Sequence, residues 1–331
     1  MTDLIPCITS LQQQIACLLT ILPLKSIAAI GTFIVLRYIN TSLSREAQNN
    51  WVKSAPWNPS NEIALVTGGS SGIGRQIVRD LARLGVKAVV IWDVREPEGT
   101  LPSNVHFYKV DITSPATIAS AATTLRAQHG HPTILINNAG IAYANSVLCL
   151  SEEEIRRTLQ VNTHSHFWTI REFLPDMVEM NHGHIVTMAS MASFSGCAGL
   201  VAYSASKAAL LGVHEGVSQE IRHIYRDGDD DGERCRVRTS IIHPLYVATP
   251  MTSVLQENKS RFRRPFITAG EVSDAVVRQI VRGDSGQVIV PESQWAVAWL
   301  RGMPGWVQEV VRDWGSRGFV RLRDQMLNGA S

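Results

Sequence analysis

Tyr203 and Lys207 are the two residues whose types and spacing most clearly suggest chemistry, in the segment Tyr203-Ser-Ala-Ser-Lys207. Residues four apart share one face of a helix, so the phenol and the ammonium would point into the same space. A tyrosine with an ordinary pKa of about 10 is a poor base at neutral pH, and a nearby cation favours its phenolate form. The pair therefore predicts proton transfer by a tyrosine, although this spacing is common by chance.

Other polar residues at the ends of apolar strands strengthen this interpretation. Ser190 closes one such strand, at the end that faces a ligand in an open parallel sheet, where its hydroxyl can donate to a substrate oxygen. An Asn-Asn-Ala-Gly segment ends another strand, and its Asn138 and Gly140 would line a cofactor. Asn162 lies inside a predicted helix, where asparagine is a mediocre helix former and so needs an explanation.

A glycine-rich turn, Thr67-Gly-Gly-Ser-Ser-Gly-Ile-Gly-Arg75, follows the first predicted strand and opens a helix. Its glycines allow the backbone to approach a pyrophosphate, and the helix N-terminus favours the negative charge. Glycine alone is weak evidence, but the order of strand, turn and helix is the context that dinucleotide binding requires. The cofactor-binding residues predicted in this turn are Gly68, Ser70, Gly72, Ile73 and Gly74.

Asp93 ends the second predicted strand, about twenty residues beyond the glycines. A carboxylate at this position can accept hydrogen bonds from both ribose hydroxyls of NAD, and it would repel the 2′-phosphate of NADP. Arg95 is the residue that could rescue NADP binding. The charge argument favours NAD over NADP.

The elements that must position these residues alternate between short apolar strands and helices, which indicates a parallel sheet covered on both faces. The expected strands are 62–67, 87–92, 105–110, 133–137, 184–189, 237–243 and 287–291, and the expected helices include 73–84, 115–127, 151–163, 201–226 and 269–282. Ser151 and Glu154 form a capping box at the start of one helix. The predicted fold is a single doubly wound, Rossmann-like α/β sheet, with its ligand at the carboxyl ends of the strands.

Composition excludes several classes of protein. The 331 residues are 45% hydrophobic and 18% charged, which argues against a largely disordered chain, and the net charge of +2 argues against a nucleic-acid binder. The five cysteines show no metal-ligand spacing, and we expect them to be free thiols. The acidic segment 227–233 lacks the last ligand of a calcium loop, so no metal site is predicted.

An apolar run from Ile15 to Leu36 is long enough to span a bilayer, but Lys25 and Pro23 lie near its middle. We expect membrane association, through either one kinked transmembrane helix or two short helices in one leaflet. The alternatives are a helix packed on the catalytic domain and a cleaved signal peptide. Basic residues after the run predict that the catalytic domain faces the cytosol.

The C-terminal tail is rich in tryptophan and arginine. Trp295, Trp299, Trp306 and Trp314 alternate with several arginines, which suits a membrane interface or a flap over an apolar substrate. The alternative is that Trp295 and Trp299 form a buried helix stripe. The predicted organisation is an anchor and linker over 1–60, a catalytic domain over 61–292 and this tail over 293–331.

Taken together, these motifs resemble the short-chain dehydrogenase/reductase family over roughly residues 61–292. The resemblance implies that Tyr203 is the general acid/base, that Lys207 lowers its pKa and holds the nicotinamide ribose, and that Ser190 orients the carbonyl or alcohol. It also implies that Asn162 lies in a kinked helix that positions a relay water. The remaining implied cofactor contacts are Asp111 to the adenine, Asn138 near the ribose, and Val247 and Thr249 to the carboxamide. Leu245 replaces the usual glycine after the sixth strand.

Within this family, the apolar N-terminal run resembles the branch of membrane- or lipid-droplet-associated retinol and hydroxysteroid dehydrogenases. The resemblance implies a small apolar alcohol or ketone as substrate, NAD or NADP as cofactor, and a location at the endoplasmic reticulum or a lipid droplet. It is also compatible with a homodimer. Two alternatives remain open, an NADP-dependent ketone reductase of a specialised metabolite and a non-catalytic nucleotide-binding scaffold at a membrane.

Overall fold

The computed structural model describes residues 24–225, 234–257 and 265–328 of the chain, so the predicted acidic segment 227–233 lies outside the described residues. The chain divides into two compact units, Met1–Gln48 and Asn49–Ser331. The described part of the first unit is the helix α2 (Leu24–Gln48), which contains the second half of the predicted apolar run. Among the described residues, no helix combines the length and the apolarity that crossing a membrane requires.

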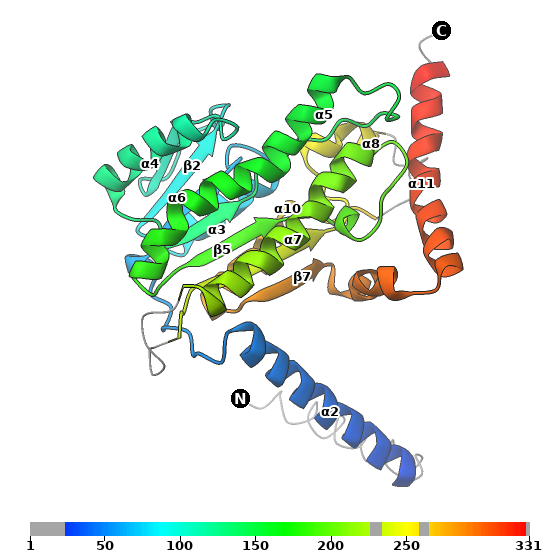
Figure 1. Ribbon diagram of the computed structural model, residues 1–331, viewed down its shortest axis with the longest axis horizontal. Helices are drawn as coiled ribbons and strands as arrows, with labels where there is room; N and C mark the ends of the chain where they lie inside the picture. Colours follow the sequence, from blue (N-terminus) through cyan, green and yellow to red (C-terminus); the bar gives the residue numbers. More distant parts are fainter. Residues whose placement is uncertain (1–23, 226–233, 258–264, 329–331) are drawn as a thin grey trace, which may run out of the picture. The chain divides into compact units, whose positions relative to one another are not determined.

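The second unit is built on a seven-stranded sheet in which every neighbouring pair is parallel (Figure 1). The strand order is β3-β2-β1-β4-β5-β6-β7. The bounds are β1 (Ile63–Thr67), β2 (Ala88–Asp93), β3 (Val105–Lys109), β4 (Ile134–Asn137), β5 (His184–Met188), β6 (Arg238–Pro244) and β7 (Gly286–Val290). All seven predicted strands are present within one or two residues of their expected bounds, and the doubly wound fold is confirmed.

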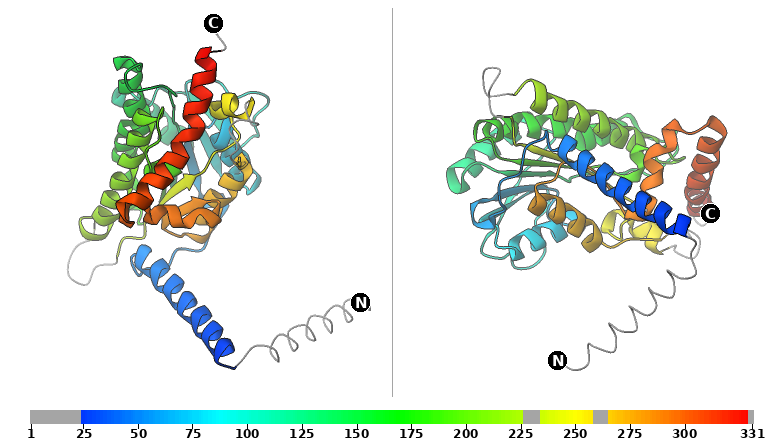
Figure 2. Two further views of the ribbon diagram at one scale, coloured as in Figure 1. Left: turned by 90° about the vertical axis from the view of Figure 1, so that its right-hand side faces the viewer. Right: turned by 90° about the horizontal axis from the view of Figure 1, so that it is seen from below.

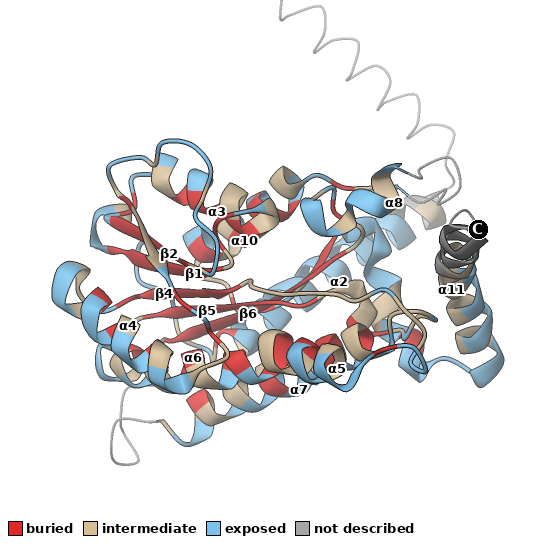
Figure 3. Ribbon diagram, turned by 90° about the horizontal axis from the view of Figure 1, so that it is seen from above, coloured by how far each residue is buried: buried red, intermediate tan, exposed pale blue. Residues whose placement is uncertain are grey.

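Two layers of helices cover the sheet (Figure 3). One face carries α3 (Gly72–Arg83) and α10 (Ala269–Arg282), and the other carries α4 (Pro115–His129), α6 (Ser165–Glu179) and α7 (Val201–His223). Successive strand residues point to opposite faces, so Ala64 and Val66 pack with α3 and α10, whereas Leu65 packs in the core of the other layer. Burial on both faces explains the continuous apolar strands of the sequence.

The helix expected over 151–163 ends earlier and continues in a different form. It begins with the predicted Ser151 and Glu154 capping box, runs as α5 (Glu152–Leu159), and passes through a π-helical turn, η2 (Gln160–His164), into α6. Asn162 lies in this π turn. Such turns interrupt α-helices and recur at functional sites.

Six further helical elements of the second unit lie in the described part of the chain. They are η1 (Pro59–Asn61), η3 (Met191–Ser193), η4 (Pro250–Thr252), α8 (Ser253–Glu257), η5 (Glu292–Gly302) and α11 (Gly305–Asn328). Figure 2 shows α11 crossing the edge of the sheet at which the parallel strands end. That edge is where an open α/β sheet binds its ligand.

Residues that directly follow α2 are bonded into the second unit. The guanidinium of Arg238, buried at the start of β6, donates to the carbonyl oxygens of Asn49 (2.7 Å) and Val52 (2.5 Å). The side-chain oxygen of Asn49 accepts from the Ser285 backbone (2.7 Å), and Ser54 Oγ donates to the Gly283 carbonyl (2.6 Å). The predicted linker therefore includes residues that are part of the second unit.

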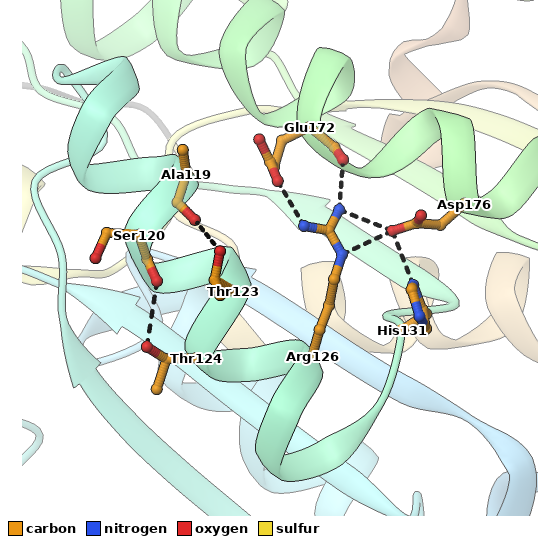
Figure 4. Close-up of polar contacts among 8 residues, drawn as sticks. All are labelled: Ala119, Ser120, Thr123, Thr124, Arg126, His131, Glu172 and Asp176. Atoms are coloured by element: carbon orange, nitrogen blue, oxygen red, sulfur yellow. Dashed lines mark hydrogen bonds and ion pairs between the residues drawn. The ribbon is translucent and has the colours of Figure 1, made fainter.

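A charged network ties α4 to α6 (Figure 4). Arg126 of α4 pairs with Glu172 (2.6 Å) and Asp176 (2.7 Å) of α6, and His131 lies 3.0 Å from Asp176. Burial alone would raise the pKa of Asp176, but hydrogen bonds from His131 and Arg126 outweigh it, so the pKa lies below its ordinary value. A carboxyl whose pKa is lowered by folding stabilises the protein when it is ionised.

Replacing Arg126 by methionine should therefore lower the free energy of unfolding by about 1–3 kcal/mol, since two partly buried carboxylates lose their cation. The contribution of Asp176 is present above the ordinary pKa of 3.8 and is lost as the pH falls through the lower folded value. Thermal unfolding at several pH values would show the wild type losing this advantage over Arg126→Met in acid. A constant difference between the two proteins at every pH would contradict the assignment.

Candidate active site

The predicted catalytic side chains converge at the carboxyl end of β5. Ser190 follows this strand, and Tyr203 and Lys207 lie in the first two turns of α7. The Tyr203 hydroxyl is hydrogen bonded to the Ser190 side chain. The ammonium of Lys207 lies 5.9 Å from the centroid of the Tyr203 ring, and it donates to the carbonyl oxygen of Met188 (2.7 Å). The structure thus brings the three residues together.

Burial acts on the protonation of both members of this pair. Burial raises the pKa of Tyr203 because desolvation disfavours the phenolate, and the hydrogen bond from Ser190 offsets this only in part. Burial also lowers the pKa of Lys207 to about 8, because its ammonium is almost fully enclosed. Burial thus shifts both pKa values toward the neutral forms, but with a pKa of about 8 Lys207 still carries its positive charge near pH 7.

Asn162 connects the π turn to the two neighbouring elements. Its side-chain oxygen accepts from the backbone of Ile141 (2.8 Å), and its nitrogen donates to the Ile141 carbonyl (2.9 Å) and to Ser206 Oγ (3.0 Å). Gly140 faces the same place, since a Cβ there would lie 3.5 Å from the Asn162 oxygen and 3.6 Å from Lys207 Nζ. The predicted residues Asn162, Gly140 and Lys207 are therefore close neighbours.

The glycine turn is held against the end of β4. Asn138 donates from its side chain to the carbonyl oxygens of Thr67 (3.0 Å) and Gly68 (3.1 Å). A Cβ at Gly74 would lie 2.2 Å from the Gly68 oxygen, and Gly68 itself adopts a left-handed φ of +65°. These two positions require glycine, because any side chain at Gly74 would collide with backbone.

Two structural features indicate that the site can bind a dinucleotide. Ser71, the N-cap residue of α3, makes no side-chain capping bond, so the first backbone N–H groups of the helix remain available to an anion. Asp93 accepts hydrogen bonds from the Ser70 backbone (3.1 Å) and the Arg95 backbone (3.1 Å), one to each carboxylate oxygen. Each oxygen keeps a further acceptor position, which suits ribose hydroxyls.

Three other predicted cofactor residues, Thr249, Val247 and Asp111, are held by different contacts. Thr249 packs over the turn, since a Cβ at Gly72 would lie 3.3 Å from its methyl carbon. Val247 is buried and bridges to Ile267, while the Asp111 carboxylate accepts bonds from the Thr113 backbone (3.0 Å) and hydroxyl (2.8 Å). Asp111 is thus positioned by its own turn rather than by the glycine turn.

Leu245, the residue that departs from the family pattern, donates its backbone N–H to Val290 (2.8 Å) and packs against the core shared by α3 and α10. The Leu245 side chain therefore contributes to the hydrophobic core.

Three residues whose side chains hydrogen bond one segment of the site to another were not identified as site residues from the sequence. Thr67 Oγ1 accepts from the backbones of Asn138 (3.0 Å) and Ala139 (3.1 Å), Ser206 Oγ donates to the Tyr203 carbonyl (2.7 Å), and Ser193 Oγ donates to the Lys207 carbonyl (2.8 Å). Thr67 carried a recognisable signal, a polar residue at the last position of a buried strand. Ser206 lies between the two catalytic candidates in the sequence, and Ser193 lies three residues after Ser190.

The C-terminal elements contact the turn that follows β5 and Ser190. Arg301 of η5 donates to the carbonyl oxygens of Ser193 (3.0 Å) and Phe194 (3.4 Å), and Leu300 is buried. Trp295 and Trp299 are 57% and 64% exposed and stack edge to face, with 5.4 Å between ring centroids. The alternative of a buried tryptophan stripe is therefore wrong.

Comparison with known proteins agrees with this geometry. The pattern of the short chain dehydrogenase family matches residues 62–260. Dehydrogenase RED2 from Cochliobolus heterostrophus is 46% identical over 198 residues, which cover 59% of this chain and 73% of that protein. Human 17-beta-hydroxysteroid dehydrogenase 13 is 34% identical over 67% of this chain and 71% of its own length. Retinol dehydrogenase 10-B from Xenopus laevis is 31% identical over 61% of this chain and 66% of its own.

Among solved structures, a short chain dehydrogenase/reductase from Burkholderia phymatum in complex with NAD superposes with a TM-score of 0.63. It is 22% identical and covers 73% of this chain and 92% of its own. At this identity the likeness concerns the fold. The suspected resemblance to hydroxysteroid and retinol dehydrogenases is confirmed by the sequence relatives.

Proposed function

The chain belongs to the short-chain dehydrogenase family, and from this premise we propose that it transfers a hydride between a nicotinamide cofactor and a secondary alcohol or ketone of an apolar substrate. It is an NAD(P)-dependent dehydrogenase or reductase; the substrate class, the cofactor preference and the residue roles are what we propose. The observation that carries the proposal is the convergence of Ser190, Tyr203 and Lys207 beside a glycine turn at one edge of the sheet.

In the proposed mechanism, Tyr203 exchanges the proton of the substrate hydroxyl, and Ser190 donates a hydrogen bond to the substrate oxygen. When bound, the nicotinamide ring accepts or returns the hydride, and its positive charge in the oxidised form favours the Tyr203 phenolate. Lys207 adds a cation next to the phenol, and Asn162 holds the backbone of Ile141 at the mouth of the site. Burial of the phenol makes this electrostatic support necessary for oxidation at neutral pH.

An apolar substrate is supported by the aromatic surface beside the site. Trp295 and Trp299 are exposed on η5, the element whose Arg301 contacts the turn that follows Ser190. An exposed pair of large aromatic side chains next to a site is typical of apolar recognition. We expect steroid, retinoid and long-chain secondary alcohols to be turned over with kcat/KM at least about tenfold above a short polar alcohol. Preference for the short polar alcohol would contradict this substrate class.

Asp93 should select NAD over NADP. Replacing it with asparagine removes the negative charge and keeps an acceptor oxygen for one of the two backbone N–H groups, those of Ser70 and Arg95. We expect the ratio of kcat/KM for NAD to that for NADP to fall about tenfold, because the repulsion of the 2′-phosphate is lost. Steady-state kinetics with both cofactors measures this ratio, with Glu96→Gln, an exposed neighbour, as a control. A wild type that prefers NADP would favour the alternative of an NADP-dependent ketone reductase.

We also propose that the chain associates with a membrane surface of the endoplasmic reticulum or lipid-droplet type, with the catalytic unit facing the cytosol. Apolar side chains of α2 support this proposal, since Phe33 is 65% and Leu36 is 60% exposed. Replacing both with aspartate should reduce flotation of the full-length protein with phospholipid vesicles, because apolar burial supplies the binding energy. Ser42→Asp with Ser44→Asp adds the same charge on the same helix and should have a smaller effect. Equal flotation of all three proteins would refute the role of α2. The predicted homodimer stays a prediction.

A further inference from the structure

A buried histidine that the proposed mechanism does not use lies against the residue that carries the catalytic hydroxyl. His243, near the end of β6, has no exposed surface, and its Nδ1 lies 3.0 Å from the carbonyl oxygen of Ser190. Its ring packs on Phe194 with 4.5 Å between ring centroids. The contact with Ser190 therefore gives this histidine a specific target in the site.

The hydrogen bond determines the tautomer of the ring. A carbonyl oxygen only accepts, so Nδ1 carries the proton and Nε2 carries the lone pair. Nε2 is buried and has no hydrogen-bond partner among the described residues. Burial lowers the pKa of His243 to about 4, with Lys207 contributing in the same direction against the Ser190 hydrogen bond. The ring is thus a neutral donor that does not take up a second proton near neutral pH.

Other contacts hold the turn after β5, including those from Arg301 to Ser193 and Phe194, but few act on the Ser190 backbone. The Ser190 oxygen also accepts from the Ser193 backbone (2.9 Å), and Ser190 Oγ accepts from the Ala192 backbone (3.2 Å), so both bonds are internal to the turn. Ser193 Oγ ties the far side of the turn to the Lys207 carbonyl (2.8 Å). Among the described residues, the contact from His243 links the Ser190 carbonyl to the neighbouring strand β6, next to the bond from the Ala189 backbone to Ile242 (2.9 Å).

We propose that His243 is a positioning residue for the hydroxyl of Ser190. By holding the Ser190 carbonyl at the strand end, the Nδ1–H group fixes the backbone from which the hydroxyl is presented to the substrate oxygen. A donor must be in place before charge develops, so its displacement lowers the rate of the chemical step more than substrate binding. This inference rests on the proposed role of Ser190 in hydride transfer.

Two substitutions test the proposal. His243→Leu removes the donor. His243→Asn keeps one, because its amide nitrogen, like Nδ1 of histidine, is two covalent bonds from Cβ. We expect His243→Leu to lower kcat about tenfold with KM and cofactor affinity changed less than about twofold, and His243→Asn to recover most of the loss. An asparagine variant as slow as the leucine variant, or a defect confined to KM, would overturn the proposal.

A second buried histidine on the neighbouring strand provides the matched control. His184 begins β5, at the opposite end of the strand from Ser190, and its Nε2 lies 2.9 Å from Ser240 Oγ. His184→Leu should lower thermal stability as His243→Leu does but leave kcat unchanged. An equal loss of kcat in the His184 variant would mean general loosening of the sheet, against a positioning role.

The contact can also be measured without any turnover. Nitrogen-15 NMR of histidine-labelled full-length protein should show His243 neutral, with the proton on Nδ1, between about pH 6 and 9. A proton on Nε2, or a doubly protonated ring in this range, would overturn the proposal. This measurement is independent of the proposed function, whose own failure would appear as a wild type without dehydrogenase activity.

Discussion

Replacing Tyr203 with phenylalanine is expected to lower kcat/KM by about 10²–10⁴-fold, the usual contribution of a positioned general acid/base. The phenol is the group hydrogen bonded to Ser190 at the carboxyl end of β5, and the substitution removes its hydroxyl. The ring that lies 5.9 Å from Lys207 Nζ remains, so cofactor affinity should change little. Kinetics and a cofactor-binding titration on the same preparation separate these two effects.

Tyr225→Phe is the matched control for this experiment. Tyr225 follows α7, and its hydroxyl donates to Glu220 (2.8 Å), away from the site. Loss of that hydroxyl should leave kcat/KM within about twofold of the wild type. A Tyr203→Phe protein that retains the wild-type rate would show that another group moves the proton.

Replacing Lys207 with methionine is the second large expected effect. The ammonium is the cation beside a phenol whose pKa burial already raises, so its loss should push that pKa higher. We expect the pH profile for alcohol oxidation to move about 1–3 units toward alkaline pH, with a fall of about 10²-fold or more in kcat near neutrality. The profile of kcat/KM against pH is the measurement.

The same substitution also removes the donor to the Met188 carbonyl, so a fold check by circular dichroism belongs with it. Lys87→Met, at an exposed position before β2, controls for the loss of a lysine. A Lys207→Met profile that coincides with the wild type would remove Lys207 from the electrostatics of the site.

The sheet was predictable because its strands carry continuous apolar runs that only burial on both faces explains. Ser190 and Asn138 were predictable for a related reason, since polar residues at the ends of buried parallel strands gather at one edge. Tyr203 and Lys207 followed from helical spacing. Local sequence pattern and the geometry of a parallel sheet are sufficient to place all of these residues.

Other features depend on contacts between segments far apart in the chain. The Nδ1 contact from His243 to Ser190 and the Arg238 bonds to residues 49–52 join positions that no local pattern relates. The π turn at Asn162 is stabilised by hydrogen bonds with Ile141 and Ser206, which lie far from it in the chain. Such contacts leave no local signal, and the sequence therefore predicted one continuous helix over 151–163. The raised pKa of Tyr203 likewise follows from burial, which spacing alone does not reveal.

The central claim is hydride transfer from a secondary alcohol to a nicotinamide ring at the site of Tyr203. The most direct measurement incubates the full-length protein and NAD with apolar alcohols that carry deuterium on the carbinol carbon, followed by mass spectrometry of the cofactor and the product. We predict ketone formation with deuterium transferred to the reduced cofactor, and loss of both in Tyr203→Phe. Absence of transfer from every steroid, retinoid and long-chain alcohol with either NAD or NADP would contradict the account.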